Sequence, residues 1–161
     1  MPSTTGKYEQ LFGAHGIYLT RAAAIVPQTA TTTFYTVTGL VALYACILEV
    51  TTAIQAQADA IKWRHTPTGG AVGDVSGTID INAFAVGDFI VMQGPTDAGA
   101  ASQALTQVGA TGGGTGLTLL HRPIALRAGA LGLNAAASNT GNIKGHLIYQ
   151  PLLPGSKIVA A

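Results

Sequence analysis

The sequence predicts an all-β protein, an antiparallel β-sandwich or jelly-roll-like fold with an extended N-terminal arm. Two observations support this fold class. Runs of β-branched, aromatic and aliphatic residues recur at about ten-residue spacing, as in sheets built from six to nine short strands. Gly, Pro, Asn and Asp residues separate these runs, and such residues are typical of turns. The 161 residues fit a single domain.

The first thirty residues differ in composition and pattern from the rest of the chain. They are polar and then Ala-rich, show no sustained period, and contain Pro27, which ends any regular element. We therefore expect an arm over residues 1–30 and one β-sandwich domain over residues 31–161.

The expected strands of the domain begin with residues 31–37, which end at Gly39. Residues 40–52 predict a second, mostly apolar strand that is covered on both faces. Residues 53–65 have a helical composition but alternate in polarity, which favours a strand. Residues 94–116 predict a long loop, Ala128-Gly129 a turn, and residues 139–142 a hairpin turn. The remaining expected strands are 77–83, 88–93, 117–120, 123–126, 131–137 and 143–150.

Charge is scarce throughout the chain. Charged residues make up 9% of the sequence, against about a quarter in an ordinary soluble domain. Charges spread over the surface usually keep soluble domains from associating with one another. A chain with so few charges therefore predicts a subunit whose surface is covered in an assembly. The net charge of +1 predicts no attraction to nucleic acid or anionic lipid. The longest apolar run, residues 37–50, is too short to span a membrane.

The few charges are segregated along the sequence. Four acids lie in a stretch without Lys or Arg, and no acid follows them, whereas four bases do. Two interpretations are open: chance in a charge-poor chain, or complementary patches that set the register between subunits. The residues concerned are Asp74, Asp80, Asp88 and Asp97, followed by Arg122, Arg127, Lys144 and Lys157.

No motif predicts catalysis, a cofactor or a metal. The Gly-rich stretch 109–116 lacks the Lys-Ser/Thr pair of a phosphate loop. The four histidines are far apart, and Asp80 with Asn82 lacks the other ligands of a calcium loop. Cys46, the only cysteine, excludes an intrachain disulfide and is expected to be a small buried side chain.

The densest basic and aromatic cluster is the segment from Lys62 to His65. Trp and Arg are typical of the central residues of protein interfaces, although such a cluster can also stack a base or bind phosphate. We favour a subunit or shell contact. The candidate contact residues are Lys62, Trp63, Arg64, Arg122 and Arg127.

Several stretches resemble small virion proteins of tailed bacteriophages, and the resemblance covers most of the chain from residue 33 onward. Arg127 and Gly145 depart from that pattern, since the group has a Pro and an aromatic residue there. The stretches are 60–70 (AIKWRHTPTGG), 86–94 (VGDFIVMQG), 122–129 (RPIALRAG), 139–144 (NTGNIK) and 147–155 (LIYQPLLPG).

The resemblance implies a non-enzymatic capsid decoration, or cement, protein on the surface of a phage head. Such a protein is expected to form homotrimers and to bind the major capsid protein, with no nucleic-acid or membrane partner. We do not expect a major capsid protein, because the chain is short for that shell fold and has no counterpart of its long spine helix. One alternative is a tail or head-fibre component that binds host carbohydrate through the 94–116 loop and Trp63. Another is a small hydrolase that uses scattered Asp and His residues, His121 or His146 among them.

Overall fold

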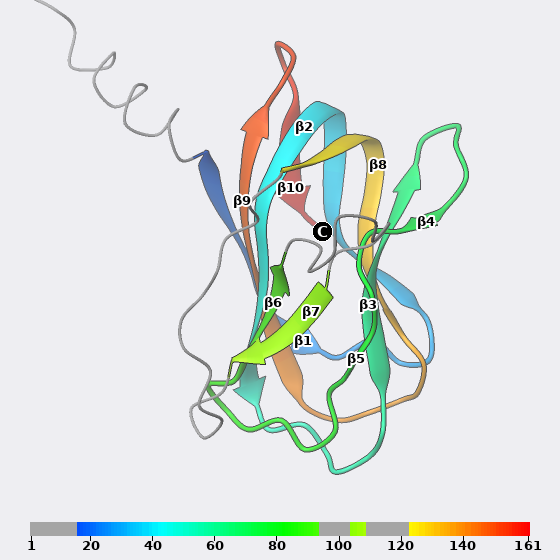
Figure 1. Ribbon diagram of the computed structural model, residues 1–161, viewed down its shortest axis with the longest axis vertical. Helices are drawn as coiled ribbons and strands as arrows, with labels where there is room; N and C mark the ends of the chain where they lie inside the picture. The colour runs from blue at the N-terminus through cyan, green and yellow to red at the C-terminus, as the bar shows by residue number, and fades with distance from the viewer. Residues whose placement is uncertain (1–15, 94–103, 109–122) are drawn as a thin grey trace, which may run out of the picture.

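The computed structural model describes residues 16–93, 104–108 and 123–161, and these residues form ten strands and no helix (Figure 1). Every strand pairing is antiparallel, so the predicted all-β antiparallel class is confirmed. Hydrogen bonds join the strands into one sheet, whose main path runs β1-β9-β2-β8-β3-β4. The strands are β1 (Ile17–Ile25), β2 (Thr31–Thr52), β3 (Ala60–Pro67), β4 (Gly73–Asp74), β5 (Ile79–Asp80), β6 (Phe89–Gln93), β7 (Ala104–Val108), β8 (Ile124–Ala135), β9 (Asn142–Pro151) and β10 (Lys157–Ala160).

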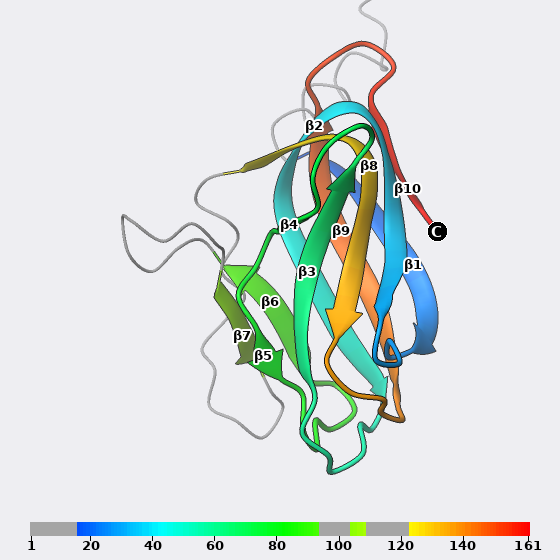
Figure 2. The same cartoon turned by 90° about the vertical axis from the view of Figure 1, so that its right-hand side faces the viewer.

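Strand β2 pairs with more strands than any other strand of the described sheet. Its first half pairs with β8 and β10, and its second half pairs with β9 and β6. Gly39 lies at an irregularity in the β2–β8 pairing and has a φ of +70°, a left-handed conformation that glycine adopts without strain. Figures 1 and 2 show β2 arching over one end of the molecule, so that its halves run along opposite sides of the core. The expected break at Gly39 is therefore a bend within one strand.

Strand β8 is also longer than the sequence pattern predicts. The two strands and the Ala128-Gly129 turn expected there are wrong, because residues 124–135 form one strand. Gly129 has a φ of +153°, and a Cβ there would lie 2.6 Å from the Cα of Pro67 in β3. Glycine at this position permits close approach of the two backbones rather than a chain reversal.

The turn between β8 and β9 does not form a hairpin, so that prediction is wrong. The two strands pair with opposite edges of β2 instead of with each other. Asn139 stabilises the crossing: its Oδ1 accepts from the N–H of Thr140 at 2.8 Å, and its Nδ2 donates to the carbonyl of Gln57 at 3.1 Å. The residue types of a turn were recognised correctly, but not the strands that it connects.

Other boundaries differ from the expectations to varying degrees. The strands at 88–93 and 143–150 correspond to β6 and β9. The strand expected at 53–65 begins only at Ala60, and the one at 77–83 is reduced to the two residues of β5. The predicted 94–116 loop contains β7, while its other residues from 94 to 103 and from 109 to 116, and the strand expected at 117–120, lie outside the described residues.

The boundary proposed at residue 30 does not separate an arm from the sheet. Residues 17–25 form β1, which pairs with β9 with a bulge between Arg21 and Ala24. Three consecutive alanines, a residue depleted in strands, weaken the sequence signal for this element. Residues 1–15 lie outside the described residues.

Aromatic side chains from β2 and β3 meet in the hydrophobic core. Trp63 packs edge-on against Phe34, with ring centroids 5.6 Å apart, and lies 6.2 Å from the ring of Tyr35. Such aromatic pairs stabilise a core by more than the burial of their apolar surface alone would provide. Cys46 is buried here as predicted, and burial raises the pKa of its thiol.

Candidate interaction surfaces

The basic cluster predicted on β3 is held by an acid of the neighbouring strand. Register places Arg64 opposite Asp74 of β4. Lys62 Nζ lies 2.6 Å from Asp74 Oδ2, and Arg64 Nε lies 2.8 Å from Asp74 Oδ1. The hydrogen bonds from Lys62 and then Arg64 lower the pKa of the Asp74 carboxyl. Both bases therefore have a partner within the chain, in an exposed site where ion pairs contribute little to stability.

The other predicted contact residues are in different environments. Trp63 is only 1% exposed, so its assignment to a surface contact is wrong: alternation along β3 turns it into the core. Arg122 lies outside the described residues. Arg127 is exposed on β8, and none of the described residues forms a hydrogen bond or an ion pair with its guanidinium.

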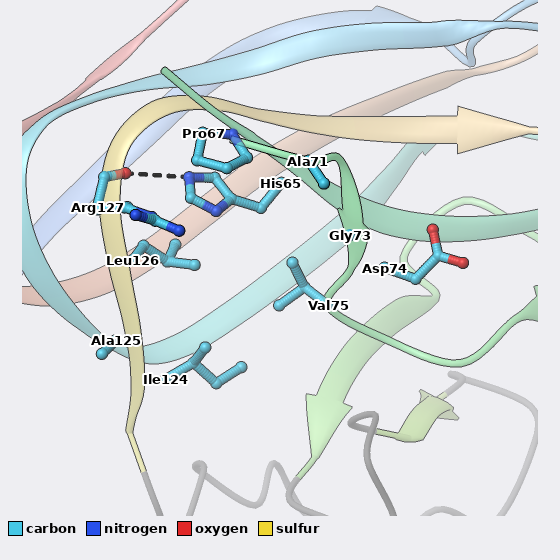
Figure 3. A pocket seen from close by; sticks show the side chains of 10 residues that line it. All are labelled: His65, Pro67, Ala71, Gly73, Asp74, Val75, Ile124, Ala125, Leu126 and Arg127. Atoms are coloured by element: carbon cyan, nitrogen blue, oxygen red, sulfur yellow. Dashed lines mark hydrogen bonds between the residues drawn. The ribbon is translucent and has the colours of Figure 1, made fainter. Parts of the chain in front are cut away.

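Arg127 borders a hollow of about 340 Å³ between β3, β4 and the beginning of β8 (Figure 3). The imidazole of His65 lies beside it, and His65 Nε2–H donates to the Arg127 carbonyl at 3.0 Å. Burial, and to a lesser extent the charge of Arg127, lowers the pKa of His65, although the backbone hydrogen bond opposes them. The hollow is lined by His65, Pro67, Ala71, Gly73, Asp74, Val75, Ile124, Ala125, Leu126 and Arg127.

An apolar surface follows the opposite side of the sheet, along β1, β10 and the loop that joins β9 to β10. Six of the eight exposed large apolar side chains among the described residues belong to these segments. Strands β1 and β10 lie side by side in Figure 2, and Arg21 Nε of β1 donates to the carbonyl of Ala161 at 3.2 Å. We call this the apolar edge: Ile17, Tyr18, Ile25, Leu152, Leu153 and Val159.

The apolar edge was missed by sequence reasoning, which assigned residues 17–25 to the arm. The available signal was the pair of large apolar residues at each end of that segment, Ile17-Tyr18 and Ile25-Val26. Strand edges that lack a neighbour and carry exposed apolar side chains are sites at which other chains add.

A chain of side-chain hydrogen bonds links β1 to the two strands next to it in the sheet. The hydroxyl of Tyr18 lies 2.7 Å from His146 Nδ1, and His146 Nε2 lies 3.0 Å from Glu49 Oε2. A neutral imidazole satisfies both contacts, since the Tyr18 hydroxyl donates to one nitrogen and the other nitrogen donates to the carboxylate. Lys144 Nζ is 4.0 Å from the same carboxylate oxygen. The cluster links three adjacent strands.

Acids in the middle of the chain serve mainly as acceptors for loop backbone. Asp59 Oδ1 accepts from the N–H groups of Ala136 and Ala137, at 3.1 and 2.9 Å. Asp80 Oδ1 accepts from the N–H of Asp59 at 2.8 Å, and buried Asp88 accepts from the N–H of Ala85 at 2.9 Å. Three of the four segregated acids, Asp74, Asp80 and Asp88, thus bind groups of their own chain, and Asp97 lies outside the described residues.

The described residues contain no group of three or more His, Cys, Asp or Glu side chains that could hold a metal ion. His65 and His146 belong to the separate sites above, while His15 and His121 are outside the described residues. In the described part of the chain, no helix is long and apolar enough to cross a membrane.

Comparison with known proteins finds no matching family model, no matching curated protein and no matching solved structure. The functional conclusions therefore depend on the residues and their geometry.

Proposed function

We propose that this chain is a non-enzymatic structural protein of a phage virion, a decoration protein that binds the head as a homotrimer and bridges neighbouring capsomers. The apolar edge carries the proposal. It combines strand edges that have no neighbour among the described residues with exposed apolar side chains in a charge-poor chain. An edge of this kind favours association with another chain.

The proposed role needs only modest affinity at each contact. When one subunit of a trimer has bound a shell, the others bind from a high effective concentration, so several weak contacts give durable attachment. The charge-poor surface suits this role because neighbouring copies do not repel one another.

Light scattering and electron microscopy test the proposal together. We expect purified protein to be trimeric, to bind expanded phage shells and to be labelled by antibody on phage heads. The double substitution Ile25→Thr with Val159→Thr is expected to weaken trimer formation. The control Val72→Thr changes a similarly exposed apolar residue outside the apolar edge and is expected to have no effect. A monomer that does not bind shells contradicts the proposal.

Binding of host carbohydrate by a tail or head fibre is the alternative. Trp63, one of its two suggested contacts, is buried, and its 94–116 loop is described only at residues 104–108. Glycan binding by the purified protein, together with antibody labelling at the tail tip, would favour this alternative over decoration.

A further inference from the structure

We propose that the edge of β8 at residues 124–127, which no strand of the described residues covers, binds an extended acidic segment of a partner protein together with the guanidinium of Arg127. This inference rests on the proposed function and deepens it by naming the chemistry that the partner must present. It assigns the hollow in Figure 3 as a peptide-binding site.

The first part of β8 has one strand neighbour in the described structure. Residues from Ile124 to Arg127 pair with β2, whereas β3 pairs with β8 only from Gly129 onward. Successive residues of an antiparallel strand direct their N–H and C=O groups to alternate sides. The Arg127 carbonyl points away from β2, because it accepts from His65. By the same alternation, the N–H and C=O of Ala125 face the hollow and can pair with an added strand.

The charges around the hollow select an acidic occupant. Among the residues that line the hollow, Arg127 is the cation and Asp74 is the acid. Asp74 is engaged by Lys62 and Arg64, so Arg127 is the cation that offers its full set of donors. A guanidinium binds a carboxylate through two parallel hydrogen bonds, which a lysine cannot reproduce.

The floor of the hollow fits the other side chains of such a segment. Pro67, Val75 and Leu126 are buried apolar residues that line it, and Ile124 is half-buried beside them. Side chains of an extended strand alternate between two faces, so acidic residues facing Arg127 place the intervening residues over this floor. Addition of a strand to a sheet edge is a general mode of peptide recognition, in which backbone bonds provide affinity and side chains provide specificity.

Nuclear magnetic resonance of the isotopically labelled full chain tests the proposal. The probe is a blocked octapeptide of alternating Asp and Val, and the matched control peptide alternates Asn and Val. We expect the Asp peptide to shift the amide signals of Ala125 and Arg127 and the ring signals of His65, and to bind about tenfold more tightly than the Asn peptide. Equal affinity for the two peptides, or shifts elsewhere, would overturn the proposal.

Variants separate the charge from the strand edge. Arg127→Ala is expected to weaken binding of the Asp peptide about tenfold and Arg127→Lys to weaken it less, whereas Lys157→Ala, which removes an exposed cation of β10, leaves it unchanged. Ala125→Pro removes an N–H that faces the hollow and is also expected to weaken binding, once its folding has been verified by the amide spectrum. Equal effects of Arg127→Ala and Lys157→Ala contradict the proposal.

Two further outcomes distinguish other occupants. The first uses a sulfated oligosaccharide as the probe. If Arg127→Ala weakens its binding and Ala125→Pro does not, the occupant is an anionic glycan and not a peptide. Loss of self-association in Arg127→Ala would assign the hollow to a second copy instead. The peptide titration does not depend on where the protein is located, so absence from phage heads contradicts only the proposed function, and failure of the titration contradicts only this inference.

Discussion

The hydroxyl of Tyr35 occupies the space that a side chain at Gly145 would fill. A Cβ built at residue 145 overlaps the Tyr35 hydroxyl, which is buried and forms no hydrogen bond with the described residues. Burial also raises the pKa of Tyr35, since the charged phenolate is disfavoured there.

Gly145→Ala is expected to lower the free energy of unfolding by about 1–3 kcal/mol, because the added methyl group displaces the Tyr35 ring from a packed core. Urea unfolding measures the change. Gly73→Ala is the control, since a Cβ at residue 73 meets no atom within 4 Å. Tyr35→Phe removes the obstructing hydroxyl, so the double variant is expected to recover part of the loss. Strict additivity of the two substitutions would contradict the contact.

Trp63 is the only tryptophan, so its fluorescence reports on the core. Because its side chain is 1% exposed, we expect blue-shifted emission and weak quenching by acrylamide in the native state. Denaturation in guanidinium chloride provides the fully exposed reference. If acrylamide quenches the native protein as strongly as the denatured chain, Trp63 is exposed and its assignment to the core is wrong.

Asp59 connects the segment before β3 to the loop after β8. Asp59→Ala leaves two backbone N–H groups without their acceptor and is expected to destabilise the fold by about 2–3 kcal/mol. Asp59→Asn retains one carbonyl oxygen and is expected to cost less. Thermal unfolding measures both. Asp59→Ala with a stability within 0.5 kcal/mol of the parent, about the scatter of neutral surface substitutions, would contradict this role.

His65 makes stability depend on pH below neutrality. Its pKa in the folded protein is lower than the ordinary value of 6.5, so the unfolded chain binds more protons near pH 6. Stability from this group is complete above the unfolded pKa, declines as the pH falls toward the folded pKa, and changes no further below it. Ring signals of His65 should titrate below pH 6.5, and His65→Gln should reduce the pH dependence of the melting temperature. A midpoint above 6.5 would contradict the burial of this imidazole.

The candidate surfaces were predictable to different degrees. Lys62, Arg64 and Arg127 were recognisable from residue type, but only Arg127 lines the hollow, while Lys62 and Arg64 bind Asp74. Trp63 was misassigned because residue type does not tell which face of a strand is buried. The Asp74 partner was not predictable either, since it depends on the register between β3 and β4.

Local sequence by itself determined that the protein is all-β, where several strands run, and which residue types occupy the turns. These features depend on interactions among residues close in the chain, such as β propensity and the conformational freedom of glycine. Only the tertiary structure decided that Gly39 and Gly129 lie within continuous strands, that residues 139–142 cross between the two edges of β2, and that residues 17–25 join the sheet. Each of these outcomes depends on pairing between distant segments, and a residue pattern along one strand does not specify its neighbour.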